Sequence, residues 1–228
     1  MESTNPASPS QTASAIAPDS PSSPLLCLPR ELRFEIYDYL CRQEPKSYPF
    51  RQPPITCIDQ RGPPTALLTT CRYLYEEIQA YFHSKVTFTL HSENVRRTRL
   101  ADMDAASLHA LRQAKKIHVV LCWTLHLNRR DSDLCLLRYS MVLGLTELVE
   151  FLLFEQIDLE LVTVSVMDGL HMVDWDSKRR LLEPLDRLAG RVRFRAGNVV
   201  SGGDELDLEI RIKDYVKELN RVVLPACG

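Results

Sequence analysis

The residues best placed to do chemistry are an imidazole and two carboxylates that stand close together in the second half of the sequence. His171, Asp174 and Asp176 supply nitrogen and oxygen donors of the kind that hold a divalent metal ion. The group follows a predicted strand and Gly169, however, and Asp176-Ser177 equally fits the start of a helix with a capping residue. We favour the helix start, so the sequence assigns no metal ligand here.

Three Asp-x-Asp pairs have the spacing of metal-binding motifs in enzymes that use sugar nucleotides. The pairs are Asp102/Asp104, Asp131/Asp133 and Asp174/Asp176. Each pair stands where a predicted loop meets a predicted helix, and acidic side chains are expected there because the helix dipole favours them. The sequence contains no glycine-rich phosphate loop, no Gly-x-Ser-x-Gly and no His-Glu-x-x-His. We therefore predict a non-enzymatic protein without catalytic, cofactor-binding or metal-binding residues. An enzyme stays an alternative, which a pocket joining His171 to Asp174 and Asp176 would favour.

Two further groups could bind a ligand. His118 shares one face of a predicted strand with Lys116 and Cys122, which indicates a surface histidine or a hydrogen-bonded core histidine. The arginines at 191, 193 and 195 face one side of a predicted strand and, with Arg179 and Arg180 nearby, could form a basic patch for an acidic partner. A solvated sheet face explains the same spacing. Without interleaved aromatic residues, a nucleic acid is not the expected partner.

Composition and charge restrict the class of protein. The 228 residues are 45% hydrophobic and 25% charged, which is ordinary for a globular chain, and the net charge of -2 gives no general attraction for polyanions. The seven cysteines are scattered and include no Cys-x-x-Cys pair, as is typical of reduced thiols. The sequence begins without a secretory signal, and charges interrupt its apolar stretches. We expect a protein of the cytoplasm or nucleus that does not bind membranes.

The first part of the chain is predicted to be a tail followed by helices. Residues 1–24 are rich in serine and proline and are predicted to be disordered. A helix is predicted over residues 28–40, with one apolar stripe at Leu28, Leu32, Ile36 and Leu40 that Phe34 and Tyr37 widen. Prolines mark residues 43–64 as a long irregular connection, and apolar spacing predicts a second helix over 65–83. The helical region as a whole is assigned to residues 25–90.

From residue 85 onward the chain alternates between strand and helix patterns, and residues 91–228 are assigned to the body. Strands are predicted at 85–90, 116–123, 159–166, 191–195 and 206–212. Helices are predicted at 108–114, at 132–154 with a break at Gly144 as an option, at 177–189 interrupted by Pro184, and at 215–222. Strands separated by helices favour an α/β body with a small, mostly parallel sheet. An α+β fold and a leucine-rich-repeat-like solenoid are the alternatives.

Two segments of the helical region carry a resemblance to a known family. They read Leu28-Pro29-x-Glu31-Leu32-x-x-x-Ile36-Tyr37-x-Tyr39-Leu40 and Ala66-Leu67-Leu68-x-x-Cys71-Arg72-x-x-Tyr75-Glu76-Glu77. In this order, with a predicted strand holding Phe88 after them, they resemble the F-box-like proteins that are abundant in filamentous fungi. The resemblance covers residues 25–90. For the body there is only a general likeness to the α/β regions of these proteins.

The resemblance implies a partner and a role. In a typical F-box the Leu-Pro start and the first helix dock on the Skp-type adaptor of a cullin-RING ubiquitin ligase, while the rest of the chain holds a protein substrate. It follows that Leu28, Pro29, Leu32, Ile36 and Leu40 would bind the adaptor. The sequence departs from the typical pattern because a proline-rich insertion replaces the short link between the helices. Two alternatives stay open: the same leucines pack inside the molecule, or the chain is a stand-alone regulatory protein without a ligase.

Overall fold

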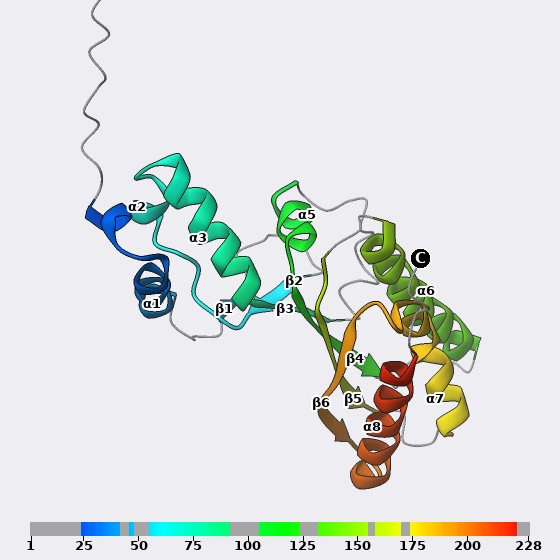
Figure 1. Ribbon diagram of the computed structural model, residues 1–228. Coiled ribbons are helices and arrows are strands. Elements are labelled where there is room, and N and C mark those ends of the chain that lie inside the picture. Colours follow the sequence, from blue (N-terminus) through cyan, green and yellow to red (C-terminus); the bar gives the residue numbers. More distant parts are fainter. Residues whose placement is uncertain are drawn as a thin grey trace, which may run out of the picture.

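The computed structural model describes seven ranges of the chain, and all structural statements refer to them (Figure 1). The ranges are residues 24–41, 46–47, 55–91, 105–123, 132–154, 158–169 and 174–222. The predicted disordered tail over residues 1–24 lies outside them except for Pro24.

The first helices form a head that lies to one side of the sheet (Figure 1). A 3-10 turn, η1 (Pro24–Cys27), precedes α1 (Arg30–Leu40), with Pro29 at the N-cap and Glu31 in the first turn. The single helix predicted over residues 65–83 is wrong, because the chain forms α2 (Thr65–Leu68) and then α3 (Arg72–Lys85). The hydroxyls of Thr69 and Thr70 donate to carbonyls of the preceding turn at 3.2 and 2.7 Å, and Cys71 is extended. These side chains end α2 locally, which the apolar spacing alone does not reveal.

Six strands form one sheet in the order β1-β2-β3-β4-β5-β6. They are β1 (Lys46–Ser47), β2 (Ile55–Ile58), β3 (Thr87–His91), β4 (Lys116–Trp123), β5 (Leu161–Asp168) and β6 (Arg193–Ser201). The strands β3 to β6 are parallel, and β1 and β2 extend the sheet antiparallel to them. The predicted α/β class with a mostly parallel sheet is therefore confirmed. The residues 43–64, predicted as an irregular connection, supply two short strands of this sheet, and the predicted boundary after residue 90 falls inside β3.

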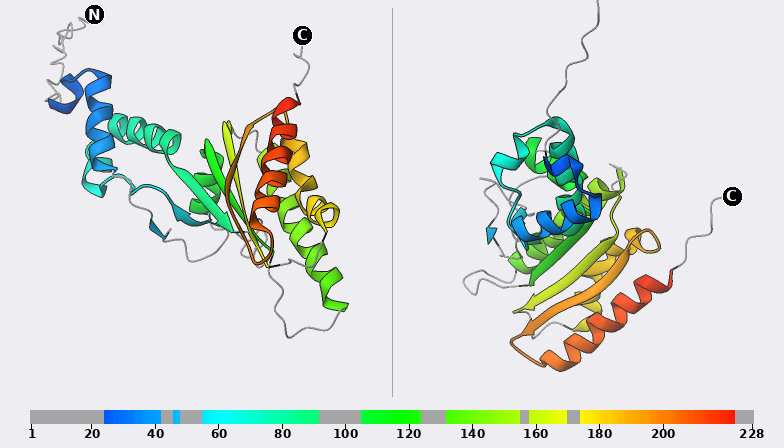
Figure 2. Two further views of the ribbon diagram at one scale, coloured as in Figure 1. Left: turned by 90° about the horizontal axis from the view of Figure 1, so that it is seen from below. Right: turned by 60° about the vertical axis from the view of Figure 1, so that its left-hand side comes forward.

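The helices of the body gather on one face of the sheet; the first three connect consecutive strands, and the last follows the final strand. They are α5 (Ala105–Arg112), α6 (Ser132–Phe154), α7 (Trp175–Leu182) with the 3-10 turn η3 (Glu183–Leu188), and α8 (Glu205–Arg221). Right-handed connections place every helix on the same side when parallel strands are added in one direction. Figure 2 shows α6, α7 and α8 layered together on that side. This strand order is also that of a leucine-rich-repeat solenoid, and the solenoid alternative stays a prediction.

One buried cluster joins this face of the sheet to the helices. Every second residue of a strand contributes to this cluster. Across β3 to β6, the paired residues Phe88, Ile117, Val162 and Phe194 form one row of it. Leucines of α6 and α7, alanine and leucine of α5, and the buried side of α8 complete it. Burial of apolar area on this scale supplies the main driving force for folding of the body.

One helix of the body replaces a predicted strand, while two others form close to the residues predicted for them. The strand predicted at 206–212 is wrong, because α8 covers these residues and buries Leu208 and Ile212 while Leu206 and Ile210 are exposed. Asp204 caps this helix by accepting from the Asp207 backbone N–H at 3.0 Å. Gly144 does not break α6. At Pro184 the helix continues as a 3-10 turn, since proline lacks the N–H that an α-helix requires.

The head joins the sheet with one residue between helix and strand. Helix α3 ends at Lys85 and β3 begins at Thr87, and the intervening Val86 is fully buried. Next to this junction the His83 ring stacks on Phe88 with ring centroids 6.2 Å apart. Burial, with a smaller contribution from His109, lowers the pKa of His83 to about 4. Its Nδ1 atom is buried without a hydrogen-bond partner among the described residues.

Candidate functional site: the outer face of the first helix

Helix α1 attaches to α3 through a buried ion pair. Arg33 Nε and Nη2 donate to the two carboxylate oxygens of Glu77 at 2.8 and 2.6 Å, and Nη1 donates to the Leu28 carbonyl at 2.5 Å. The Tyr37 hydroxyl donates to the same carboxylate at 2.9 Å. The side chains of Arg33 and Glu77 are 8% and 7% exposed. A bidentate ion pair of this kind fixes both the distance between α1 and α3 and the rotation of α1 about its own axis.

The charges of this contact are stabilised by one another. The hydrogen bonds from Arg33 lower the pKa of Glu77 despite the burial of its carboxylate. Burial, followed by the hydrogen bond to Glu77, raises the pKa of Tyr37 to about 12. At neutral pH the contact is therefore a carboxylate held by a guanidinium and a neutral phenol.

Aromatic rings surround the ion pair and complete the inner side of α1. Phe34, Tyr37 and Tyr81 lie with ring centroids 4.4 to 6.0 Å apart. Tyr37 and Ile78 are fully buried, and with Tyr81 they form the second buried cluster of the described residues. The residues that widened the predicted apolar stripe, Phe34 and Tyr37, thus supply the contact with α3.

The predicted leucine stripe lies on the opposite, outer side of α1. Leu28, Leu32, Ile36 and Leu40 line a shallow groove of about 410 Å³ together with Glu35 and Tyr39. Leu32 is 45% and Tyr39 67% exposed, and none of the four stripe residues belongs to either buried cluster of the described residues. Pro29 is exposed at the N-cap and stands next to Leu28 without lining the groove. Leu28, Ile36 and Leu40 are partly buried, so the alternative that these leucines pack inside the molecule stays open.

The residues considered for metal chemistry have other roles where the structure describes them. Asp174 caps α7 by accepting from the backbone N–H and the hydroxyl of Ser177, both at 2.9 Å, which confirms the helix start and places the cap at Asp174. Asp176 is exposed in the first turn, Asp133 lies in α6, and His171, Asp102, Asp104 and Asp131 lie outside the described residues. Across the described ranges no three histidine, cysteine, aspartate or glutamate side chains gather as a metal site would require.

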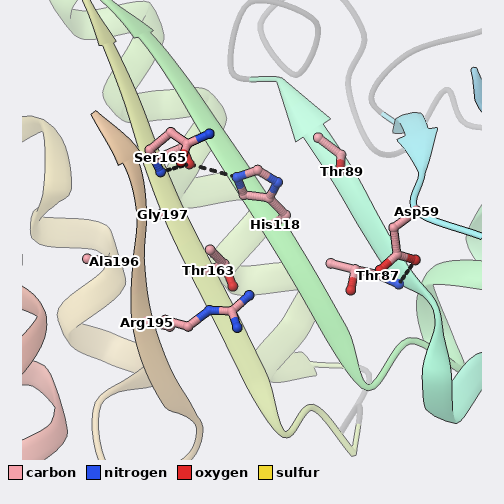
Figure 3. A pocket seen from close by; sticks show the side chains of 10 residues that line it. Asp59, Thr87, Thr89, His118, Thr163, Ser165, Arg195, Ala196 and Gly197 are labelled. Atoms are coloured by element: carbon pink, nitrogen blue, oxygen red, sulfur yellow. Dashed lines mark hydrogen bonds between the residues drawn. The ribbon is translucent and has the colours of Figure 1, made fainter. Parts of the chain in front are cut away.

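A second polar group, which sequence reasoning found only in part, lies on the sheet face opposite the helices. His118 Nε2 lies 2.8 Å from Ser165 Oγ, and Ser165 Oγ accepts from the Asn198 backbone N–H at 2.9 Å (Figure 3). The position of His118 on a strand face was predicted, and the structure gives it a hydrogen-bond partner. The signal for Ser165 was available, because Thr163 and Ser165 are polar residues two apart in an otherwise apolar strand.

The predicted basic patch is divided between two sides of the sheet. Arg193 and Arg195 are exposed on β6, whereas Arg179 and Arg180 are exposed on α7, which covers the other face. Burial, and then the charges of His91 and Arg195, lower the pKa of His118. The imidazole therefore stays neutral in a positively charged neighbourhood.

Comparison of the chain with models of known protein families, with curated proteins and with solved structures found no match. Among the helices that the structure describes, none has both the length and the apolar character needed to cross a membrane.

Proposed function

We propose that this protein is a non-enzymatic interaction protein that docks a partner protein on the outer face of α1. The observation that carries this proposal is the groove lined by Leu28, Leu32, Ile36 and Leu40, whose apolar side chains are not used to build the described core. A helix face that presents anchors at this spacing is a recurring mode of protein recognition.

The attachment of α1 supports docking because it holds the helix without using the stripe. Arg33 and Tyr37 face Glu77, so the opposite side of the same helix is directed away from α3. A helix held in place before binding loses less conformational entropy when a partner arrives. The contact of α1 with α3 thus holds the outer face of α1 in position before a partner binds.

The resemblance to F-box-like proteins supplies the class of partner. On this proposal Leu28, Pro29, Leu32, Ile36 and Leu40 bind a Skp-type adaptor, and the α/β body holds a protein substrate for a cullin-RING ubiquitin ligase. The adaptor would cover the groove with apolar side chains of its own, and the exposed Leu32 would be buried at the centre of the contact.

Isothermal titration calorimetry with a recombinant Skp-type adaptor tests this proposal. Leu32→Glu and the double change of Leu28 and Pro29 to alanine should each weaken binding by at least about tenfold. Leu206→Glu is a matched control, since Leu206 is 67% exposed on α8 in the body. No binding by the unchanged protein, or an equal loss in the Leu206→Glu control, would refute adaptor docking through this face.

One observation favours a second candidate, a stand-alone regulatory protein without a ligase. Strands β1 and β2 stand between α1 and α2 in the chain and belong to the sheet, which departs from the short link of a typical F-box. The outer face of α1 would then bind a different protein. Pull-down from the native host with the unchanged protein and with Leu32→Glu separates the two candidates, because mass spectrometry shows whether the protein lost by the variant is a Skp-type adaptor.

A further inference from the structure

A polar groove lies on the sheet face that none of the described helices covers. It has a volume of about 410 Å³ and runs across β3 to β6, with Asp59 at the side of β2. Its lining includes hydroxyls from β3 and β5, the imidazole of His118 on β4 between them, and the guanidinium of Arg195 on β6 (Figure 3). A space of this size accommodates several atoms of an extended ligand and exceeds what one small ion needs.

The floor of the groove is fixed by hydrogen bonds and by a bulge in β6. Gly197 and Asn198 lie opposite Ser165, where the register between β5 and β6 shifts. A Cβ atom built on Gly197 would overlap Ser165 Oγ, so only glycine permits this approach. Ser165 in turn holds His118 and the Asn198 backbone. The polar groups are thus positioned before any ligand arrives.

The charged groups on this face are mainly basic. Arg195 lines the groove, and Lys116 and Arg193 occupy the neighbouring register row of the same face. Neither Arg193 nor Arg195 forms an ion pair with a described residue. Asp59, the one carboxylate among the described lining residues, accepts from the Thr87 backbone N–H at 2.7 Å on the far side of the groove. An unpaired guanidinium beside hydroxyl donors fits a carboxylate better than a cation.

We propose that this groove binds an acidic segment of a partner protein, with a carboxylate of the segment paired to Arg195. The hydroxyls of Thr163 and Thr87 and the neutral His118 are available to the polar backbone of the same segment. A single strand of nucleic acid fits less well, because the described lining holds no phenylalanine, tyrosine or tryptophan ring on which successive bases could stack. The surface is separate from the outer face of α1, so the inference goes beyond the proposed function.

Fluorescence anisotropy with a labelled peptide of alternating glycine and glutamate tests the inference. The unchanged protein should bind this peptide more tightly than a matched peptide in which glutamine replaces glutamate. Arg195→Gln should weaken binding of the glutamate peptide by roughly tenfold or more, as expected for loss of a charge-assisted hydrogen bond. Arg180→Gln is the matched control: it removes the same charge from an exposed position on α7, and binding should change by less than about twofold.

Three results would overturn the inference. These are equal binding of the two peptides, no loss in Arg195→Gln beyond that of Arg180→Gln, and displacement of the peptide by inorganic phosphate at the concentration of the peptide itself, which would indicate a small-anion site. Arg195→Gln should also keep full affinity for a Skp-type adaptor. That measurement separates failure of this groove from failure of the docking proposed for α1.

Discussion

The head and the body of this protein use their side chains in opposite ways. In the head, α1 turns Arg33 and Tyr37 inward onto Glu77 and leaves its leucine stripe outside. In the body, the strands turn one row of aliphatic and aromatic side chains inward, and the groove on their outer face is lined by hydroxyls, an imidazole and a guanidinium. The contrast shows that an apolar stripe identifies a face that will be covered, but does not say whether the chain itself covers it.

The two regions also differ in how much buried apolar structure supports them. The head cluster consists of Tyr37, Ile78 and Tyr81 with a few partly buried neighbours, whereas the body cluster extends over the sheet and its helices and also includes Cys41 and Phe82 of the head. Regions with few buried contacts open at a lower cost in free energy. The head should therefore open without the body, and this difference can be measured.

The largest loss of stability is expected when the buried ion pair of the body is broken. Lys178 Nζ lies 2.6 Å from Asp168 Oδ2, and the two side chains are 8% and 0% exposed. Lys178→Met should lower the free energy of unfolding by about 3–5 kcal/mol, because it leaves the carboxylate of Asp168 buried without its cation. Urea denaturation measures this, with Arg180→Met on the exposed side of α7 as control. A loss no greater than that of the control would show that the body does not depend on this pair.

A cavity in the head should lower stability strongly, but only in α1 and α3. Ile78 is fully buried between α1 and α3, so Ile78→Ala should cost about 2–5 kcal/mol. In hydrogen–deuterium exchange, protection should fall in α1 and α3 while α8 keeps its own. Ile210→Ala at a half-exposed position of α8 should leave both regions unchanged. Equal loss of protection in α8 would mean that head and body unfold together.

The junction between the two regions should make stability depend on pH. The pKa of His83 is lowered to about 4, so the folded protein binds fewer protons than the unfolded chain between about pH 6.5 and pH 4. Stability is therefore fully present above this window and falls as the pH falls through it. Relative to His83→Phe, the unchanged protein should lose about 3 kcal/mol between about pH 8 and pH 4.

The comparison with the variant isolates His83 from the carboxylates. Glu77 also has a lowered pKa and loses stability in acid, but it does so equally in both proteins. Denaturation of both proteins at several pH values gives the difference. A constant difference between the unchanged protein and His83→Phe across this range would contradict the prediction.

The smallest change in stability is expected for substitutions on the outer face of α1. Because Leu32 is 45% exposed and joins neither described cluster, Leu32→Ser should change the unfolding free energy by no more than about 0.5 kcal/mol. Leu182→Ala at a fully buried position of α7 should cost about 2–5 kcal/mol in the same thermal or urea measurement. A comparable loss in Leu32→Ser would show that the stripe is covered by the chain itself.

The sequence predicted those elements whose patterns are long and locally consistent. The bounds of β4 and α6 agree with the prediction, since eight residues rich in β-branched and aromatic side chains or twenty-three apolar-rich ones leave little choice. The first turns of α8 were misread, because Leu206, Leu208, Ile210 and Ile212 alternate like a strand. Only packing shows that Leu208 and Ile212 share the buried side with Tyr215. Strands β1 and β2 were missed because they are short and lie among prolines.

Only those parts of the candidate sites that lie on a single helix or strand could be predicted from the sequence. The stripe of α1 follows from spacing within a helix, and its residues lie together as predicted. The pairing of Arg33 with Glu77 joins residues 44 apart, and that of His118 with Ser165 joins residues 47 apart. Such contacts depend on the register between elements, and a single sequence does not contain it.

Because Val86 alone separates α3 from β3, the two proposed binding surfaces are connected without a flexible spacer. The orientation of α1 is carried through α3 into the strand that begins the parallel part of the sheet. A molecule bound on the sheet face would accordingly be presented to a molecule bound on α1 at one angle and one separation. Insertion of a few glycines at Val86 would leave both surfaces intact but release their relative orientation. The orientation of the two bound molecules could then be changed without changing the affinity of either surface.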